Sequence, residues 1–291
     1  MKLTRLNSIF ISVILIFLAS VLVMPLLVTF INSFMSSYEI LNRYSLHLTA
    51  DNFFDATGTI HFVEISLIPT FVTLNQYFKL LFDTPLYLGL FWNSVQMTLP
   101  IVLGQILLAI PTAYVFEFSR IRCKEIIFYI YVVIMLMPLQ VSLVPNFLTA
   151  EFLNLSGYWA IVLPAIFSPF GVFLIRQSLK GMPIEYIEAA KVDGASHIKI
   201  LFHIIMPLTK PALAALAMLS FVDYWNIVDQ AVVFIKESHN EPLSVYLSRL
   251  SVGDGVGIIF AASCFYMLPS VLIFLYGQEN MIEGIRLSGI K

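Results

Sequence analysis

The segment EAAKVDGASHIKILFHIIMP, from Glu188 to Pro207, combines charged and small side chains between long apolar runs. Helical spacing would place Tyr186, Ala190 and Gly194 on one line. Small side chains let another surface approach the backbone closely. The residues therefore fit either a plain connector whose alanines favour helix or a helix that offers a contact face to another protein.

Local signals divide this region, residues 183–207, into two short helices joined by a tight turn. Pro183 can open the first helix, because proline is tolerated in a first helical turn. Gly194 stands where a left-handed residue would end that helix, and Ser196 is a good N-cap for the second. We expect Pro207 to end the second helix and to open the next apolar span. This region is called the two-helix segment below.

A second group of polar residues lies inside a long apolar run. Asp223, Asn226 and Gln230 share one stripe if a single helix carries them, and Tyr224 and Trp225 flank it. An ionisable residue inside an apolar span usually faces a cavity or a partner. Carboxylates, amides and aromatic rings suit sugars, since polar atoms bind hydroxyl groups and rings cover apolar sugar faces. The alternative is hydrogen bonding between helices.

An earlier apolar run carries further polar residues. Asn93, Gln96 and Thr98 are candidates for lining the same passage, whereas Gln105 is expected to bond to another helix. His197 and His203 are six residues apart, on different helix faces, which makes them poor joint metal ligands.

The composition identifies the elements that must position these residues. The chain is 59% hydrophobic and 12% charged, whereas roughly a quarter of the residues of a soluble domain are charged. A helix needs about 20 apolar residues to cross a bilayer. We therefore predict an all-α, polytopic transmembrane bundle of six spans: Ile9–Ile31, Leu86–Phe116, Ile126–Phe147, Tyr158–Leu174, Leu208–Phe234 and Ile258–Tyr276.

Lysine and arginine predict the direction of these spans. With six spans, 12 of the 16 fall on the side of the two termini and the two-helix segment, and four on the other side. Basic residues are enriched on the cytoplasmic side, so both termini and the two-helix segment are expected in the cytoplasm. The net charge of −2 gives no basic field for nucleic acid.

The spans suggest two regions. Residues 1–85 would hold the first transmembrane helix and a long extracytoplasmic loop, and residues 86–291 a five-helix core with a cytoplasmic loop at about 176–207. Near the end of the outer loop, Thr73 and Gln76 could form a capping box. Apolar residues at helical spacing follow it, which predicts a short amphipathic helix that packs on the membrane face or docks an external partner.

The two-helix segment resembles the cytoplasmic motif of binding-protein-dependent ABC transporter permeases, Glu-Ala-Ala-x3-Gly-x9-Ile-x-Leu-Pro. Here Glu188-Ala189-Ala190 is followed by Gly194 and, nine residues later, by Ile204-Ile205-Met206-Pro207. Met206 replaces the usual leucine. The stretches MPLQVSLVPNFL and PLTKPALAALAMLSFVDYWN are similar to carbohydrate importers of this family, such as the smaller maltose-importer permease.

The resemblance implies a multi-pass permease of a prokaryotic cell membrane, surrounded by membrane lipid, that pairs with a second homologous permease as a heterodimer. An ABC ATPase dimer would bind ATP and Mg, and an extracytoplasmic solute-binding protein would deliver a carbohydrate. The docking residues carried over from the family are Glu188, Ala189, Ala190, Asp193 and Gly194. This chain has no Gly-x4-Gly-Lys-Ser/Thr loop for phosphate, so it is expected to bind no cofactor and not to be an enzyme.

Three alternatives remain open from the residues. The cargo could be a polyamine, phosphate or a peptide instead of a sugar. An intramembrane enzyme would need a nucleophile with a base, yet no histidine lies in a predicted span. A passive channel would have no use for a coupling helix.

Overall fold

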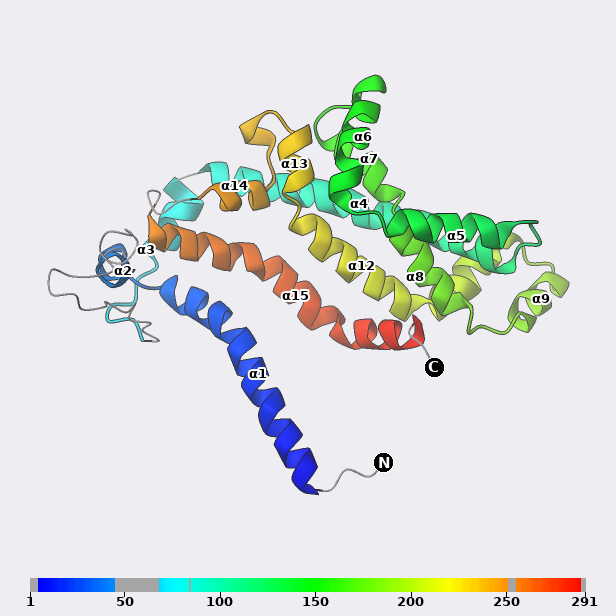
Figure 1. Cartoon of the computed structure of the whole chain (residues 1–291), viewed down its shortest axis with the longest axis horizontal. Coiled ribbons are helices and arrows are strands. Elements are labelled where there is room, and N and C mark those ends of the chain that lie inside the picture. Colours follow the sequence, from blue (N-terminus) through cyan, green and yellow to red (C-terminus); the bar gives the residue numbers. More distant parts are fainter. Residues whose placement is uncertain (1–4, 45–67, 84, 251–254, 289–291) are drawn as a thin grey trace. The chain divides into compact units, whose positions relative to one another are not determined.

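Helices form nearly all of the regular structure in the computed structural model, which describes residues 5–44, 68–83, 85–250 and 255–288 (Figure 1). Within these residues the strand-like pairing is one isolated bridge between Met35 and Val72. The all-α prediction is confirmed. The α-helices are α1 Arg5–Asn32, α2 Ser37–Tyr44, α3 Asn75–Phe78, α4 Pro85–Phe118, α5 Lys124–Met135, α6 Leu139–Phe152, α7 Tyr158–Ile166, α8 Pro169–Leu179, α9 Glu185–Val192, α10 His197–Ile200, α11 Met206–Leu208, α12 Lys210–Trp225, α13 Asp229–Phe234, α14 Leu243–Arg249 and α15 Val256–Ser288.

In the part of the chain that the structure describes, four helical stretches are long and apolar enough to cross a membrane, and two bent helix pairs bring the number to six if each pair is one span. The four are Phe10–Asn32, Pro85–Phe118, Tyr158–Leu179 and Val256–Glu279. They agree with four of the predicted spans to within a few residues. Each contains at most one charged residue, and Tyr158–Leu179 consists of α7 and α8, which are separated at Phe167 and Ser168.

The other two predicted spans are not straight helices. Ile126–Phe147 falls on α5 and α6, which meet at an angle of 102°. Pro138 stands at the N-cap of α6, and proline can neither donate a backbone hydrogen bond nor continue a preceding helix. The chain therefore turns sharply where one continuous span was expected.

Leu208–Phe234 is also interrupted. The helical run His197–Leu208 bends by 77° into α12, with the break at Thr209 and Pro211 in the first turn of α12. Pro207 was expected to end the preceding helix, but it lies in the first turn of α11, where proline is tolerated. Helix α12 ends at Trp225, and α13 begins at Asp229.

The chain divides into two compact units, and the boundaries fall within α4, α14 and α15. The first unit comprises 1–88 and 249–268. In it the predicted short amphipathic helix is present, as α3 and a π-helical turn Lys79–Asp83. The predicted capping box is wrong, because the Gln76 amide donates to Ser37 Oγ at 2.5 Å instead of reaching back toward Thr73. Residues 45–67 of the predicted outer loop lie outside the described residues.

Hydrogen bonds hold α3 to the end of α1 in this unit. The Tyr77 hydroxyl donates to Ser33 Oγ at 2.7 Å, and burial raises the pKa of Tyr77 to about 12. The phenol therefore stays protonated and keeps donating at physiological pH. The Glu39 carboxylate accepts from the backbone N–H of Thr70 at 2.8 Å.

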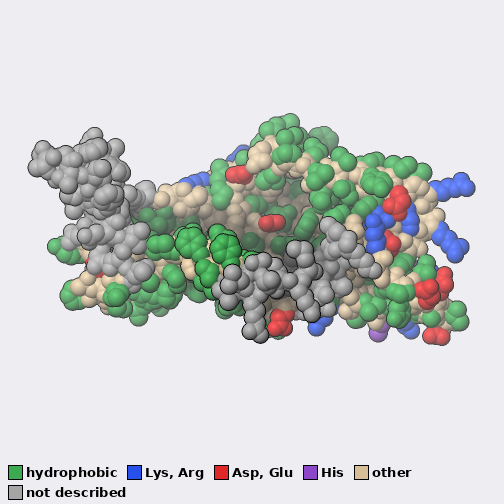
Figure 2. All heavy atoms as spheres, turned by 60° about the horizontal axis from the view of Figure 1, so that its bottom comes forward, with side chains coloured by type: hydrophobic (Ala, Val, Ile, Leu, Met, Phe, Trp, Pro, Cys, Tyr) green, Lys and Arg blue, Asp and Glu red, His purple; other side chains and the backbone are tan. Residues whose placement is uncertain are grey.

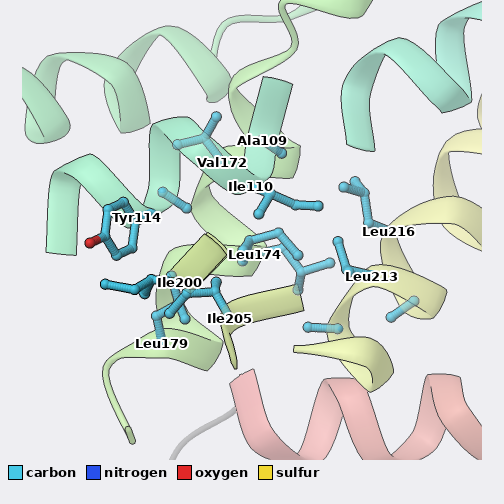
Figure 3. Close-up of a cluster of buried hydrophobic side chains, with 14 of the residues drawn as sticks. Ala109, Ile110, Tyr114, Val172, Leu174, Leu179, Ile200, Ile205, Leu213 and Leu216 are labelled. Carbon is cyan, nitrogen blue, oxygen red and sulfur yellow. The ribbon is translucent and has the colours of Figure 1, made fainter. Parts of the chain in front are cut away.

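The second unit, 89–248 and 269–291, contains two buried apolar clusters. Figure 3 shows the first, in which side chains of α4, α8, α12 and the two-helix segment point toward one another. The labelled members are Ala109, Ile110, Tyr114, Val172, Leu174, Leu179, Ile200, Ile205, Leu213 and Leu216. The second cluster joins α4, α7 and α13.

The visible surface is largely hydrophobic (Figure 2). In the second unit, for example, Ile130, Val133 and Val144 are more than half exposed. Charged side chains gather toward the end that carries α5 and α9. Large exposed apolar area is expected of a surface that meets lipid, because acyl chains replace water as its solvent.

Candidate functional site

The two-helix segment folds as its local signals predict. Gly194 has a φ of +77°, the left-handed conformation that glycine adopts without steric cost. The N–H of Ala195 returns to the carbonyl of Ala190 at 2.9 Å and closes the end of α9. Ser196 caps α10, since its Oγ accepts from the Lys199 N–H at 3.3 Å. The turn therefore holds two helices in a defined relation.

Helix α9 has one buried and one exposed side. Ile187 and Ala190 belong to the first core cluster, whereas Glu188, Ala189 and Asp193 are exposed, as is Gly194. The expected contact line of Tyr186, Ala190 and Gly194 is therefore split. Ala190 is 8% exposed, because α9 is a short helix that packs through positions 187 and 190, spaced i and i+3.

The second helix of the segment is also fastened to the membrane helices. Ile200 and Ile205 are buried in the same cluster, and the Tyr114 hydroxyl of α4 lies 3.0 Å from His197 Nδ1. Ile198 and Phe202 of the same segment remain exposed. Part of the segment's apolar side chains thus pack into the core, and its charged side chains are exposed.

A cluster that sequence reasoning missed lies close to this segment. Arg176, in the last turn of α8, is only 2% exposed. Its Nε donates to Glu117 Oε2 at 3.1 Å and its Nη2 to Glu125 Oε1 at 2.6 Å. The sequence showed Arg176 only as one of the basic residues that orient the spans, and no local signal paired it with acids 51 and 59 positions away.

The polar residues of the predicted stripe line a pocket of about 380 Å³ at the junction of α12 and α13. Its lining residues are Leu139, Asp223, Tyr224, Asn226, Ile227, Val228, Asp229 and Gln230. Two carboxylates, two amides and a phenol therefore face one hollow. A neighbouring hollow of about 270 Å³ shares Leu139, Tyr224 and Gln230 with it and adds Ser142 and Asn146.

The prediction that one helix carries Asp223, Asn226 and Gln230 is wrong. Helix α12 ends at Trp225, so Gln230 comes from α13, and the turn between the two helices brings it to the same pocket. Trp225 does not line the pocket. It is 1% exposed, stacked on Phe221 and edge-on to Phe91, with ring centroids 5.3 and 5.5 Å away.

The polar residues of α4 are not in this pocket. The Asn93 amide donates to the carbonyls of His239 and Glu241 at 2.8 and 3.1 Å, which fixes the loop after α13. Gln96 is exposed and Thr98 is fully buried. Neither is among the residues that line the α12–α13 pocket.

Gln105 bonds between helices, as predicted. Its Nε2 donates to the Ala165 carbonyl of α7 at 2.8 Å, and its Oε1 accepts from the Ser220 hydroxyl of α12 at 2.5 Å. One side chain of α4 thus ties two other helices together inside the second unit.

Comparison with known proteins identifies the family of this chain. Residues 91–278 match the family described as binding-protein-dependent transport system inner membrane component. The chain belongs to this family. It is therefore a multi-pass membrane protein and the permease component of an ABC transport system.

Relatives of this permease share most of its length. The arabinooligosaccharides transport system permease protein AraQ of Halalkalibacterium halodurans is 28% identical over 278 residues, 94% of this chain and 93% of the relative. The osmoprotective compounds uptake permease protein GgtD of Synechocystis is 30% identical over 207 residues, 69% of this chain and 70% of the relative.

A solved structure has the same fold. The crystal structure of a bacterial ABC transporter involved in the import of the acidic polysaccharide alginate contains a chain that matches the permease with a TM-score of 0.76. The alignment covers 96% of this chain and 99% of that chain at 22% identity.

Proposed function

We propose that this permease forms half of the translocation pathway of an ATP-driven importer for a sugar or oligosaccharide. The α12–α13 pocket is the observation that supports this cargo. It offers oxygen and amide groups that can exchange hydrogen bonds with hydroxyl groups, and the Tyr224 ring that can cover an apolar sugar face. AraQ, by its name a permease for arabinooligosaccharides, aligns over nearly the whole chain.

Within the pocket we assign different tasks to different groups. Asp223 and Asp229 would accept from sugar hydroxyls, and Asn226 and Gln230 can both donate and accept. Trp225 would shape the pathway from behind, because its ring is packed against Phe221 and Phe91. Asn93 would support the same region by holding the loop at 239–241.

An ATPase subunit would bind the two-helix segment and move the membrane helices through this contact. Glu188, Ala189, Asp193 and Gly194 lie on its free side and form the proposed contact surface. Ala190 would act from the buried side, since its small side chain lets α9 sit close to the core. ATP and Mg would bind the ATPase dimer, on the cytoplasmic side.

The remaining partners follow from the family. A second, homologous permease would complete the pathway as a heterodimer, and a solute-binding protein outside the membrane would deliver the cargo. A non-carbohydrate cargo is the competing proposal, because GgtD is named for osmoprotective compounds.

Growth of a strain that lacks this chain tests the proposal, with mono- and oligosaccharides as sole carbon sources and radiolabelled uptake measured in parallel. We expect loss of growth and uptake on one sugar group, restored by the wild-type chain. Normal growth on every sugar, with lost uptake of an osmoprotectant, would refute the carbohydrate cargo and support the competing one.

A further inference from the structure

Among residues whose side chains are described, Arg176 is the only lysine or arginine that is buried. Besides its bonds to Glu117 and Glu125, its guanidinium carbon lies 3.9 Å from the centre of the Phe128 ring. Arg176, Glu117, Glu125 and Phe128 are called the Arg176 cluster. Its members come from the last turns of α4 and α8 and from the start of α5.

A buried ion pair is weak evidence of stabilisation, because desolvating the charges offsets their attraction. Apolar residues of similar volume are often at least as stable. What such a network does well is to specify one arrangement of the elements that it joins. The Arg176 cluster is therefore expected to fix the arrangement of α4, α5 and α8 relative to one another.

The position of the cluster indicates what that arrangement serves. Arg176 lies between Ile175 and Leu179, which belong to the first core cluster together with Ile187 and Ala190 of α9. A turn of five residues, 180–184, separates α8 from α9. A displacement of α9 consequently reaches α8 through this apolar packing, and the Arg176 cluster is where α8 is held to α4 and α5 by charge.

The two acidic partners differ in their access to water. The Glu117 side chain is 22% exposed and the Glu125 side chain 54% exposed. Water can compete for Glu125 more readily, so this bond is the easier one to open. Nη1 of Arg176 is buried and has no hydrogen-bond partner among the described residues. The guanidinium thus keeps a free donor for a rearranged set of acceptors.

We propose that Arg176 is a positioning residue that passes the movement of the two-helix segment to α4 and α5, with Glu125 as the partner released and bound again during the transport cycle. This inference rests on the proposed function, since it needs an ATPase to move the segment. It adds the connection between the segment and the first helices of the core.

The test uses the assembled importer in proteoliposomes, with its second permease, ATPase subunits and solute-binding protein. Solute uptake and ATP hydrolysis are measured together for the wild type, Glu125→Gln, Glu125→Asp and Arg176→Lys. We expect Glu125→Gln to keep ATP hydrolysis within about twofold but to move at least about fivefold less solute per ATP. Glu125→Asp should recover part of the solute moved per ATP. Arg176→Lys should move less solute per ATP than the wild type, because lysine cannot bond both carboxylates in the same fork geometry.

Glu151→Gln is the matched control, because Glu151 is an exposed glutamate at the end of α6. It should leave the ratio of solute to ATP unchanged. A merely structural cluster would instead lower the thermal stability of the complex and reduce uptake and hydrolysis in proportion. That result, or a wild-type ratio in Glu125→Gln, would overturn the inference. Absence of ATP-driven uptake in the wild-type complex would refute the proposed function instead.

Discussion

At Gly194 a single backbone conformation shapes the surface that we assign to the ATPase. A Cβ atom built at this residue would meet nothing within 4 Å in this chain. Neighbouring atoms of this chain therefore leave room for a side chain at this position, but the φ of +77° favours glycine. The conformation ends α9 and places Ser196 to cap α10.

We predict that Gly194→Val reduces transport by at least tenfold while the protein still inserts into the membrane. A β-branched residue in the left-handed region is strained by roughly 1–2 kcal/mol or more, which would reshape the turn without touching the spans. Uptake and membrane content would be measured in the same cells. Gly194→Asn is the matched control, because asparagine tolerates this conformation, and it should retain most of the transport. Wild-type uptake by the valine variant would contradict the prediction.

The pocket residues and the loop-holding residue should respond differently to substitution. Asp223→Asn keeps the shape but removes the charge that strengthens a hydrogen bond, a loss of roughly 1.5 kcal/mol. We expect about a tenfold lower uptake rate, with the thermal stability unchanged.

Asn93→Leu should instead lower the thermal stability of the permease, since it leaves two backbone carbonyls without their donor. Equal effects of both variants on stability would place Asp223 in a structural role.

At the scale of elements, short polar contacts fix how the helices of the second unit pack. Gln105 joins α4 to α7 and α12, and Tyr158 of α7 donates to the Asn240 carbonyl at 2.6 Å. Such bonds hold the register of helices whose apolar surfaces alone would allow sliding. The bend at Pro138 and the break between α12 and α13 also belong to the element scale. Leu139, directly after the bend, and residues of the break line the pocket.

We predict that Gln105→Leu destabilises the permease by about 1 kcal/mol, the usual size of hydrogen bonds between membrane helices. The midpoint of thermal unfolding in detergent should fall by a few degrees. Gln140→Leu, at an exposed position of α6, is the control and should leave the midpoint unchanged. An unchanged midpoint for Gln105→Leu would show that the three helices pack without this bridge.

At the scale of the whole molecule, the permease sequence contains no Gly-x4-Gly-Lys-Ser/Thr motif. We propose that energy enters through contacts with another subunit. The free side of the two-helix segment is the place that the structure offers for such a contact, since it is exposed and its other side is anchored in the core.

We predict that the purified chain alone hydrolyses no ATP, and that its complex with the ATPase subunits does so, faster when loaded binding protein is added. Phosphate release by the chain and by the complex measures this difference. An ATPase-deficient variant of the partner subunit should abolish the activity of the complex. Hydrolysis by the chain alone would contradict the assignment of ATP to a separate subunit.

Features that depend on neighbours along the chain could be predicted from the amino-acid sequence. Long apolar runs locate the helical spans but not their bends. Gly194 and Ser196 predict the turn of the two-helix segment, because helix ends respond to residues a few positions away. The contacts of individual polar side chains could be assigned only from the folded chain. Arg176 meets acids more than 50 positions distant, Trp225 is packed behind the pocket, and Asn93 holds a loop. The partner of a polar side chain depends on which helices lie beside it, and periodicity along one helix does not contain that information.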